Sequence, residues 1–128
     1  MTGDEITLTI PREQPFHEVA HLVLAGFAAR QNLTFDSLDD LETALDAVLE
    51  RAEMVIDGHV TVRLRLEDGK ICAAVGPLPV ERLRAELERE PGGSVTLRRI
   101  LDTVVDDYEL DGEGWLELTQ HVEQESDS

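Results

Sequence analysis

The stretch Ser37–Ala52 constrains the fold of this chain more than any other part of the sequence. Its apolar residues recur at intervals of three and four, so they fall on one stripe of an α-helix. The stripe consists of Leu38, Leu41, Leu45, Val48, Leu49 and Ala52. Thr34 or Ser37 can cap the start of this helix. The opposite face carries Glu42, Thr43, Asp46, Ala47, Glu50 and Arg51. The chain must bury the stripe against a second layer, and any chemistry depends on the opposite face.

Before this helix, the sequence predicts one strand and one further helix. Ile6–Ile10 alternates apolar residues with threonine, which is typical of a short strand. Pro15 suits the first turn of a helix, and the helical pattern continues to about Arg30. The predicted buried stripe of that helix is Phe16, Val19, Ala20, Val23, Leu24 and Phe27.

A β-hairpin is predicted after the Ser37–Ala52 helix. Apolar residues alternate along Val60–Leu66, and Asp68-Gly69 tolerates the positive φ angles of a tight turn. The partner strand Ile71–Val75 is apolar on both faces, which indicates a central position in the sheet.

The last third of the chain adds two helices and two strands. They are expected at Val80–Arg89, from Ser94 to Val105, near Tyr108–Leu110 and at Trp115–Val122. The order β-α-α-β-β-α-α-β-β predicts an α+β fold: a two-layer α/β sandwich of a mainly antiparallel mixed sheet with helices on one face. We expect a single domain over residues 1–122 and a disordered acidic tail over residues 123–128.

The charge balance narrows the classes of partner. The formal net charge is -17, so phosphates of DNA and of anionic membranes would repel the chain. The charge favours a basic protein partner, or serves solubility. The single cysteine, Cys72, rules out an internal disulfide, and no signal peptide or membrane-spanning run is evident. We therefore expect a cytoplasmic protein.

One motif suggests a metal site. His17-Glu18-Val19-Ala20-His21 reads H-E-x-x-H, and on a helix the two histidines could hold zinc beside Glu18 as a base. Leu24 and Phe27 occupy the glycine and third-histidine places of the longer form of this motif. We therefore interpret the motif as an exposed polar helix face and expect no metal, with a zinc hydrolase as the competing interpretation.

Three sequence segments, taken in their order along the chain, resemble a known protein family. They are Val23–Arg30 with the acidic helix start Asp36–Leu41, the hairpin Val60–Val75, and Leu97–Val104 with the glycine-containing turn and strand after it. In this order the chain resembles the anti-sigma-factor serine kinases of the histidine-kinase-like (GHKL) ATPase superfamily. The resemblance covers Ile6 to Val122 and implies a GHKL or Bergerat-like fold.

The chain departs from this family at its nucleotide boxes. In the register of the leucine stripe, Ala47 stands at the place of the general-base glutamate and Arg51 at that of the Mg²⁺-binding asparagine. Alanine cannot accept a proton, and arginine repels a metal ion. Pro77 lies where the family has Asp-x-Gly-x-Gly, and of the last glycine box only Gly92-Gly93 remains. The resemblance therefore implies a degenerate nucleotide pocket with no catalytic residue and no cofactor.

Protein binding is the activity of this family that does not depend on the nucleotide boxes. Family members hold a sigma factor, and a STAS-domain anti-anti-sigma protein competes for them. Their first helix and the start of their second form the partner surface, for which the candidates here are Arg12, His17, Glu18 and His21. We expect a non-catalytic bacterial anti-sigma-factor-like regulator that binds stoichiometrically and forms a homodimer. The alternatives are an ATP-dependent protein-serine kinase anti-sigma factor, and a degenerate dimerisation or scaffold domain with another partner.

Overall fold

The computed structural model describes residues 5–52, 58–88 and 97–121, and within these ranges the chain forms a five-stranded sheet and a layer of helices. The strands are β1 (Glu5–Pro11), β2 (His59–Glu67), β3 (Lys70–Gly76), β4 (Asp107–Leu110) and β5 (Leu116–His121), in the spatial order β1-β2-β3-β5-β4. The helices are the 3₁₀ turn η1 (Gln14–Phe16), α1 (His17–Arg30), α2 (Phe35–Ala52), α3 (Val80–Glu88) and α4 (Leu97–Val104).

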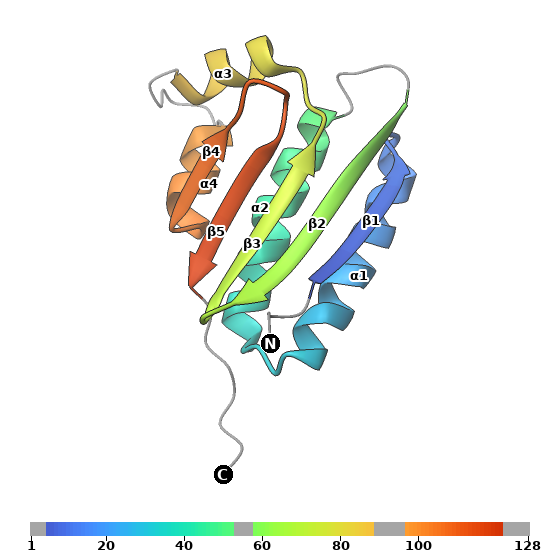
Figure 1. The fold of residues 1–128 in the computed structure, drawn as a ribbon, viewed down its shortest axis with the longest axis vertical. Coiled ribbons are helices and arrows are strands. Elements are labelled where there is room, and N and C mark those ends of the chain that lie inside the picture. The colour runs from blue at the N-terminus through green and yellow to red at the C-terminus, as the bar shows by residue number, and fades with distance from the viewer. Residues whose placement is uncertain (1–4, 53–57, 89–96, 122–128) are drawn as a thin grey trace.

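The two-layer α+β architecture and the predicted element order are confirmed. Figure 1 shows α1, α2 and α4 on one face of the sheet, with α3 at one end. β3 occupies the centre of the sheet, as its apolar residues on both faces predict. One detail of the sheet differs from the prediction of a mainly antiparallel mixed sheet. All four pairings among the described strands are antiparallel, so these strands form no mixed sheet.

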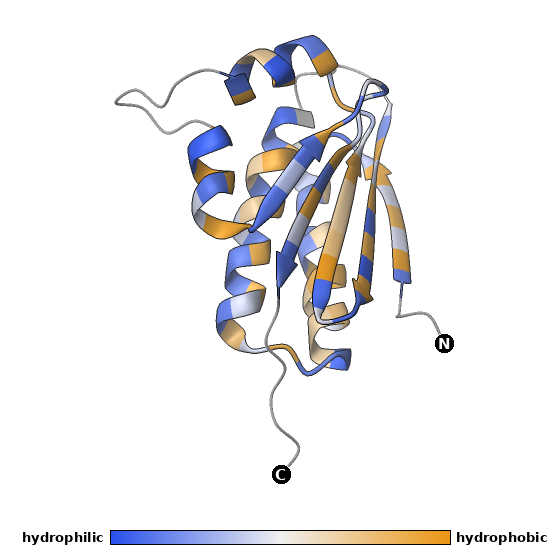
Figure 2. Cartoon of the chain, turned by 60° about the vertical axis from the view of Figure 1, so that its left-hand side comes forward, coloured by the Kyte–Doolittle hydropathy of each residue, from blue (hydrophilic) through white to orange (hydrophobic). Residues whose placement is uncertain are grey.

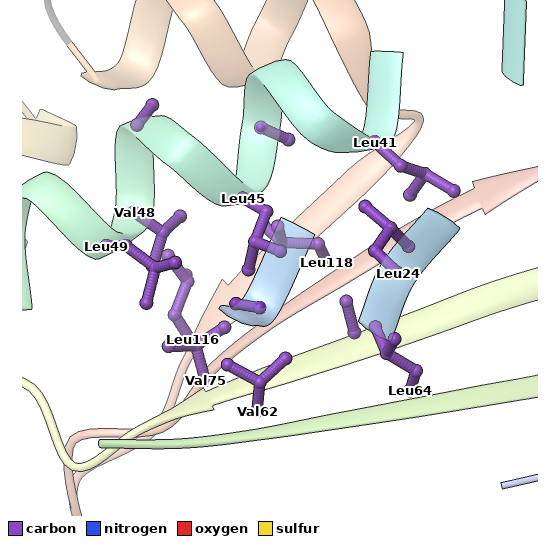
Figure 3. Packing of buried hydrophobic residues seen from close by; sticks show 14 of the residues in the cluster. Leu24, Leu41, Leu45, Val48, Leu49, Val62, Leu64, Val75, Leu116 and Leu118 are labelled. Atoms are coloured by element: carbon purple, nitrogen blue, oxygen red, sulfur yellow. The ribbon is translucent and has the colours of Figure 1, made fainter. Parts of the chain in front are cut away.

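Helix α2 lies in the helical layer and packs against the sheet. Thr34 is its cap, because the Thr34 hydroxyl accepts a hydrogen bond from the Ser37 amide at 3.3 Å. Figure 3 shows the leucine stripe pointing into the core between the layers. The stripe residues Leu41, Leu45, Val48 and Leu49 meet Val62, Leu64, Val75, Leu116 and Leu118 of the sheet and Leu24 of α1. Each such side chain contributes about 1.5–3 kcal/mol when it is fully buried.

The β2–β3 hairpin has the predicted turn. Asp68 and Gly69 both have positive φ, at 52° and 75°, and Glu67 pairs with Lys70 across them. Two consecutive positive φ angles define the tight hairpin turn whose twist matches that of the strands. Figure 2 shows hydrophobic and hydrophilic residues alternating along β2, with Val60, Val62 and Leu64 buried. The turn therefore sets the register that places these residues in the core.

The predicted buried face of α1 is partly wrong. Phe16 and Val19 are 38% and 39% exposed, whereas His17 is only 4% exposed. The core side of the helix consists of His17, Ala20, Leu24, Phe27 and Ala28. The helix is apolar around most of its circumference, so its sequence pattern alone did not select the face that packs. The expected exposed polar face around His17 is likewise wrong.

Some predictions fall outside the described residues. These are the remnant glycine box with Gly93, the cap at Ser94, the end of the final strand at Val122 and the tail 123–128. Across the described ranges, the helices are all too short or too polar to cross a bilayer.

Candidate functional site

Arg51 of α2 makes a short polar contact with Glu86 of α3. Its Nη2 lies 2.7 Å from Oε1 of Glu86 on α3, and its Nε lies 3.3 Å from the same oxygen. Nη1 donates to the carbonyl oxygen of Ala47 at 3.1 Å. The two side chains are only 14% and 17% exposed. An arginine that meets a carboxylate through two nitrogens in a sheltered site makes a strong and directional contact.

The Glu86 carboxylate also receives the first amide of α4. The Leu97 N–H donates to Oε1 of Glu86 at 3.1 Å, so the same oxygen accepts from Arg51 and from a helix start. The amides at a helix start have no partner within the helix and favour a negative charge. The Arg51–Glu86 pair therefore fastens α2, α3 and α4 together at one end of the helical layer.

The positions that the resemblance assigns to nucleotide chemistry are thus filled by the chain's own groups. Arg51, at the expected place of a metal-binding asparagine, already has a carboxylate partner. Ala47 is buried and carries no group that could take a proton.

The segment after β3 is held by backbone contacts. Pro77 is exposed, while Leu78 is buried and its amide donates to the Gly114 carbonyl at 2.7 Å. Gly114 has a φ of +98°, and a Cβ on it would lie 2.6 Å from the Leu78 carbonyl oxygen. The turn before β5 therefore packs against residues 77–79 more closely than any residue with a side chain allows.

A groove lined with carboxylates runs along the outer side of α2. Two hollows, of about 360 Å³ and about 430 Å³, share His21, Asp46 and Glu50 and so form one continuous feature. We call it the acidic groove, and its carboxylates are Glu18, Asp39, Glu42, Asp46 and Glu50. His21 Nε2 lies 3.4 Å from an Asp46 carboxylate oxygen, a long contact. Two imidazoles, of His17 and His21, also line the groove, and its five carboxylates attract a cationic group.

The four predicted partner-binding residues separate into two pairs. Glu18 is exposed and His21 half-buried, and both line the acidic groove. Arg12 is buried, and His17 Nε2 donates to the Arg12 carbonyl oxygen at 3.2 Å. Arg12 Nε and Nη1 have no hydrogen-bond partner in the described structure, and burial lowers the pKa of this guanidinium from its ordinary value. Burial leaves Arg12 and His17 little surface to offer a partner, although the small exposed part of His17 lines the acidic groove.

The H-E-x-x-H histidines are used differently from each other. His17 is buried against a backbone carbonyl, and His21 pairs with Asp46. Within the described ranges, no group of three or more His, Cys, Asp or Glu side chains is arranged to hold a metal ion.

Most of the exposed large apolar side chains of the described residues belong to the first helical elements of the chain. Among the described residues five large apolar side chains are exposed, and four of them lie on η1, α1 and the first residue of α2. Leu22 is 73% exposed and Phe35 77% exposed, with Phe16 and Val19 completing the set. We call these four residues the apolar helix surface.

The sequence patterns predict only some of the residues of this candidate site. The pairing of Arg51 with Glu86 joins residues that lie 35 positions apart, so helical spacing carries no signal for it. Leu22 lies outside the predicted core stripe of α1, which is the one sequence signal for the apolar helix surface.

Comparison with known proteins gives no family assignment. No model of a known protein family matches the chain. A search of curated proteins likewise finds no matching sequence.

Proposed function

We propose that this protein is a cytoplasmic, non-catalytic regulator that resembles anti-sigma factors and binds a protein partner stoichiometrically. The partner proposed is a sigma factor, a STAS-domain anti-anti-sigma protein, or each in turn. The first helix and the start of the second are the elements that the family resemblance assigns to partner binding.

The apolar helix surface is the observation that carries this proposal. Leu22 and Phe35 are each about three-quarters exposed, at 73% and 77%, although each costs free energy in water. Four of the five large apolar side chains exposed in the described residues belong to the elements that the resemblance assigns to partner binding, which supports their use for protein contact. A few side chains buried near the centre of an interface supply most of its binding free energy.

The acidic groove supports a basic partner. Glu18 and His21 of α1 line it together with carboxylates of α2, so a negative surface adjoins exposed apolar residues on α1. A partner that presents apolar side chains flanked by lysine or arginine would complement both features. Such complementarity raises the association rate and excludes acidic competitors.

The Arg51–Glu86 pair supports binding without catalysis. A nucleotide-bound Mg²⁺ at Arg51 would meet a cation, and a nucleotide that displaced Glu86 would remove the closer of the two carboxylates that pair with Arg51, the other being the more exposed Glu50. Ala47 offers no general base. The protein-serine kinase alternative would need other residues for both tasks.

Affinity capture with a matched pair of variants tests the proposal. Tagged wild-type protein, Leu22→Asp and Ala85→Asp are used to capture proteins from a bacterial lysate that contains sigma factors. Ala85 is an exposed helix residue on α3, so its variant carries the same added charge away from the apolar helix surface. An aspartate placed in a desolvated interface should weaken binding by about thirtyfold or more.

The proposal predicts a sigma factor or STAS protein in the wild-type and Ala85→Asp eluates, at a fixed molar ratio, and its loss with Leu22→Asp. Transfer of phosphate from Mg·ATP to the captured protein would move the kinase alternative to first place. Capture of only unrelated partners would favour the scaffold alternative.

A further inference from the structure

Strand β1 forms one edge of the sheet, and none of the described strands pairs with its outer side. Figure 1 shows α1 behind β1 at this edge. An edge strand presents a row of unpaired backbone N–H and C=O groups, so another extended segment can pair with it. The opposite edge, β4, is only four residues long and carries Asp107 and Glu109, whereas β1 has seven residues and a single charge, at Glu5. Short and charged strands resist pairing, so β1 is the edge better suited to it.

A groove lies between β1 and α1 beside this edge, with a volume of about 390 Å³. Its lining residues are Glu5, Ile6, Val23, Gly26, Phe27 and Arg30. Ile6 points to the helical side of the sheet, because it pairs with the buried Leu64, yet it remains 37% exposed. Val23 of α1 is half-buried on the other side of the groove. An apolar side chain placed there would remove both residues from water, which is favourable.

Gly26 leaves space in this groove that the described chain does not use. It lies inside α1, where glycine is less favourable than alanine because it loses more backbone freedom on folding. Its φ is not positive, and a Cβ on it would meet no described atom within 4 Å. Neither its backbone conformation nor packing within the described residues therefore requires glycine. Its effect is to leave the helix backbone open to close approach by another molecule.

We propose that an extended segment of another protein adds to β1 as a further strand of the sheet and places an apolar side chain in this groove. In such complexes main-chain hydrogen bonds provide affinity, and pockets for alternate side chains provide specificity. Side chains alternate along a strand, so every second residue of the added segment faces α1 and the groove. The residues between them lie on the side of the sheet that carries Thr7 and Thr9.

The surroundings of β1 define the chemistry of this segment. The hydroxyls of Thr9 and Thr61 share a hydrogen bond at 2.9 Å, so a threonine of the segment beside Thr7 or Thr9 would extend that row. Glu5 lies 3.9 Å from Arg63, so the edge requires no fixed countercharge. The net charge of -17 repels an acidic segment and attracts a basic one. The segment therefore alternates apolar residues with threonine and lysine.

This inference does not rest on the proposed function. The groove is lined by residues of β1 and α1, and none of them belongs to the apolar helix surface. Leu22→Asp should therefore leave binding at β1 unchanged, and a change at Gly26 should leave capture through the apolar helix surface unchanged. The two variants distinguish failure of one proposal from failure of the other.

Fluorescence anisotropy with a labelled peptide tests the proposal. The probe is Lys-Val-Thr-Leu-Thr-Val-Lys, which matches β1 in length and alternates apolar with polar residues. It should bind with a dissociation constant of about 10–100 µM, because one strand and one filled groove make a small interface. A peptide of the same composition without the alternation should bind at least about tenfold more weakly.

Two N-methylated probes test the main-chain pairing directly. Amides of alternate residues point to the same edge of a strand, so methylation of every second amide blocks one edge of the peptide. One of the two methylated peptides should lose binding by about tenfold or more, and the other should bind like the parent. Equal binding of both would overturn strand addition.

Variants of the protein locate the peptide in the groove. Gly26→Leu fills the groove and should weaken binding by about tenfold or more. Ala85→Leu adds a leucine at an exposed residue of α3 and should have no effect. Gly26→Ala should raise the Tm by about 3 °C, because alanine favours the helix and its Cβ meets no described atom. A lower Tm would contradict the unused space at Gly26. Circular dichroism confirms that each variant is folded.

Hydrogen–deuterium exchange provides an independent readout. The bound peptide should slow exchange of the β1 amides and leave those of β4 unchanged. Absence of saturable binding up to about 1 mM would overturn the proposal, as would binding that Gly26→Leu leaves intact. Loss of binding with Leu22→Asp instead would overturn it by placing the peptide on the apolar helix surface. Self-association that Gly26→Leu abolishes would overturn it by assigning the groove to a second copy of the chain.

Discussion

Replacing Glu86 with alanine should destabilise the fold by about 2–3 kcal/mol. Exposed ion pairs contribute up to about 1 kcal/mol, whereas removal of one partner from a buried pair costs about 3–5 kcal/mol. The Arg51–Glu86 pair lies between these limits, with 14% and 17% exposure, so we assign it about 2 kcal/mol. The lost acceptor for the Leu97 amide adds up to about 1 kcal/mol. For a chain of this length the sum lowers Tm by about 10 °C.

A double-mutant cycle measured by urea unfolding isolates the free energy of the Arg51–Glu86 interaction. It compares the wild type, Arg51→Ala, Glu86→Ala and the double variant. The coupling free energy from this cycle should exceed about 1 kcal/mol, because the two groups are in direct contact. Glu67→Ala is the control, since Arg65 and Glu67 are half exposed and 3.6 Å apart. It should cost less than about 0.5 kcal/mol. A coupling free energy no larger than this control effect would show that the pair does not hold the helices together.

Two further predictions concern the turn before β5. Amides of Trp115 and Glu113 donate to the Asp111 carboxylate and lower its pKa, so this group stabilises the fold at neutral pH and that stability is lost as the pH falls below about 4. Asp111→Asn should therefore make the decline in unfolding free energy between pH 5 and pH 3 shallower in urea titrations, and an unchanged slope would contradict this cause. Gly114→Ala should lower Tm by several degrees in a thermal scan, because its φ of +98° and its contact with Leu78 leave no room for a Cβ, and an unaltered Tm would contradict that packing.

Parts of the fold with strong local signals were predictable from the sequence. The leucine spacing of α2 specified one buried face, and Asp68-Gly69 specified the hairpin turn. Helix α1 was not predictable in the same way, because apolar residues such as Val19 and Leu22 occur around most of its circumference. Only its packing against β1 and α2 decides which of them is buried.

The candidate site was less predictable than the fold for a related reason. Periodicity placed Arg51 on the outer face of α2, but its partner Glu86 comes from a helix that is distant in the sequence. The burial of Arg12 and His17 depends on how the end of β1 meets the start of α1, and spacing alone contains no information on this.

A calorimetric titration of the purified protein with Mg·ATP and Mg·ADP tests whether the site around Arg51 can bind a nucleotide. We expect no binding heat and no rise in Tm at nucleotide concentrations of about 1 mM, since Arg51 and Glu86 already pair with each other. Saturable binding in the micromolar range would contradict a pocket that binds no nucleotide, and the serine-kinase alternative would then replace the non-catalytic regulator.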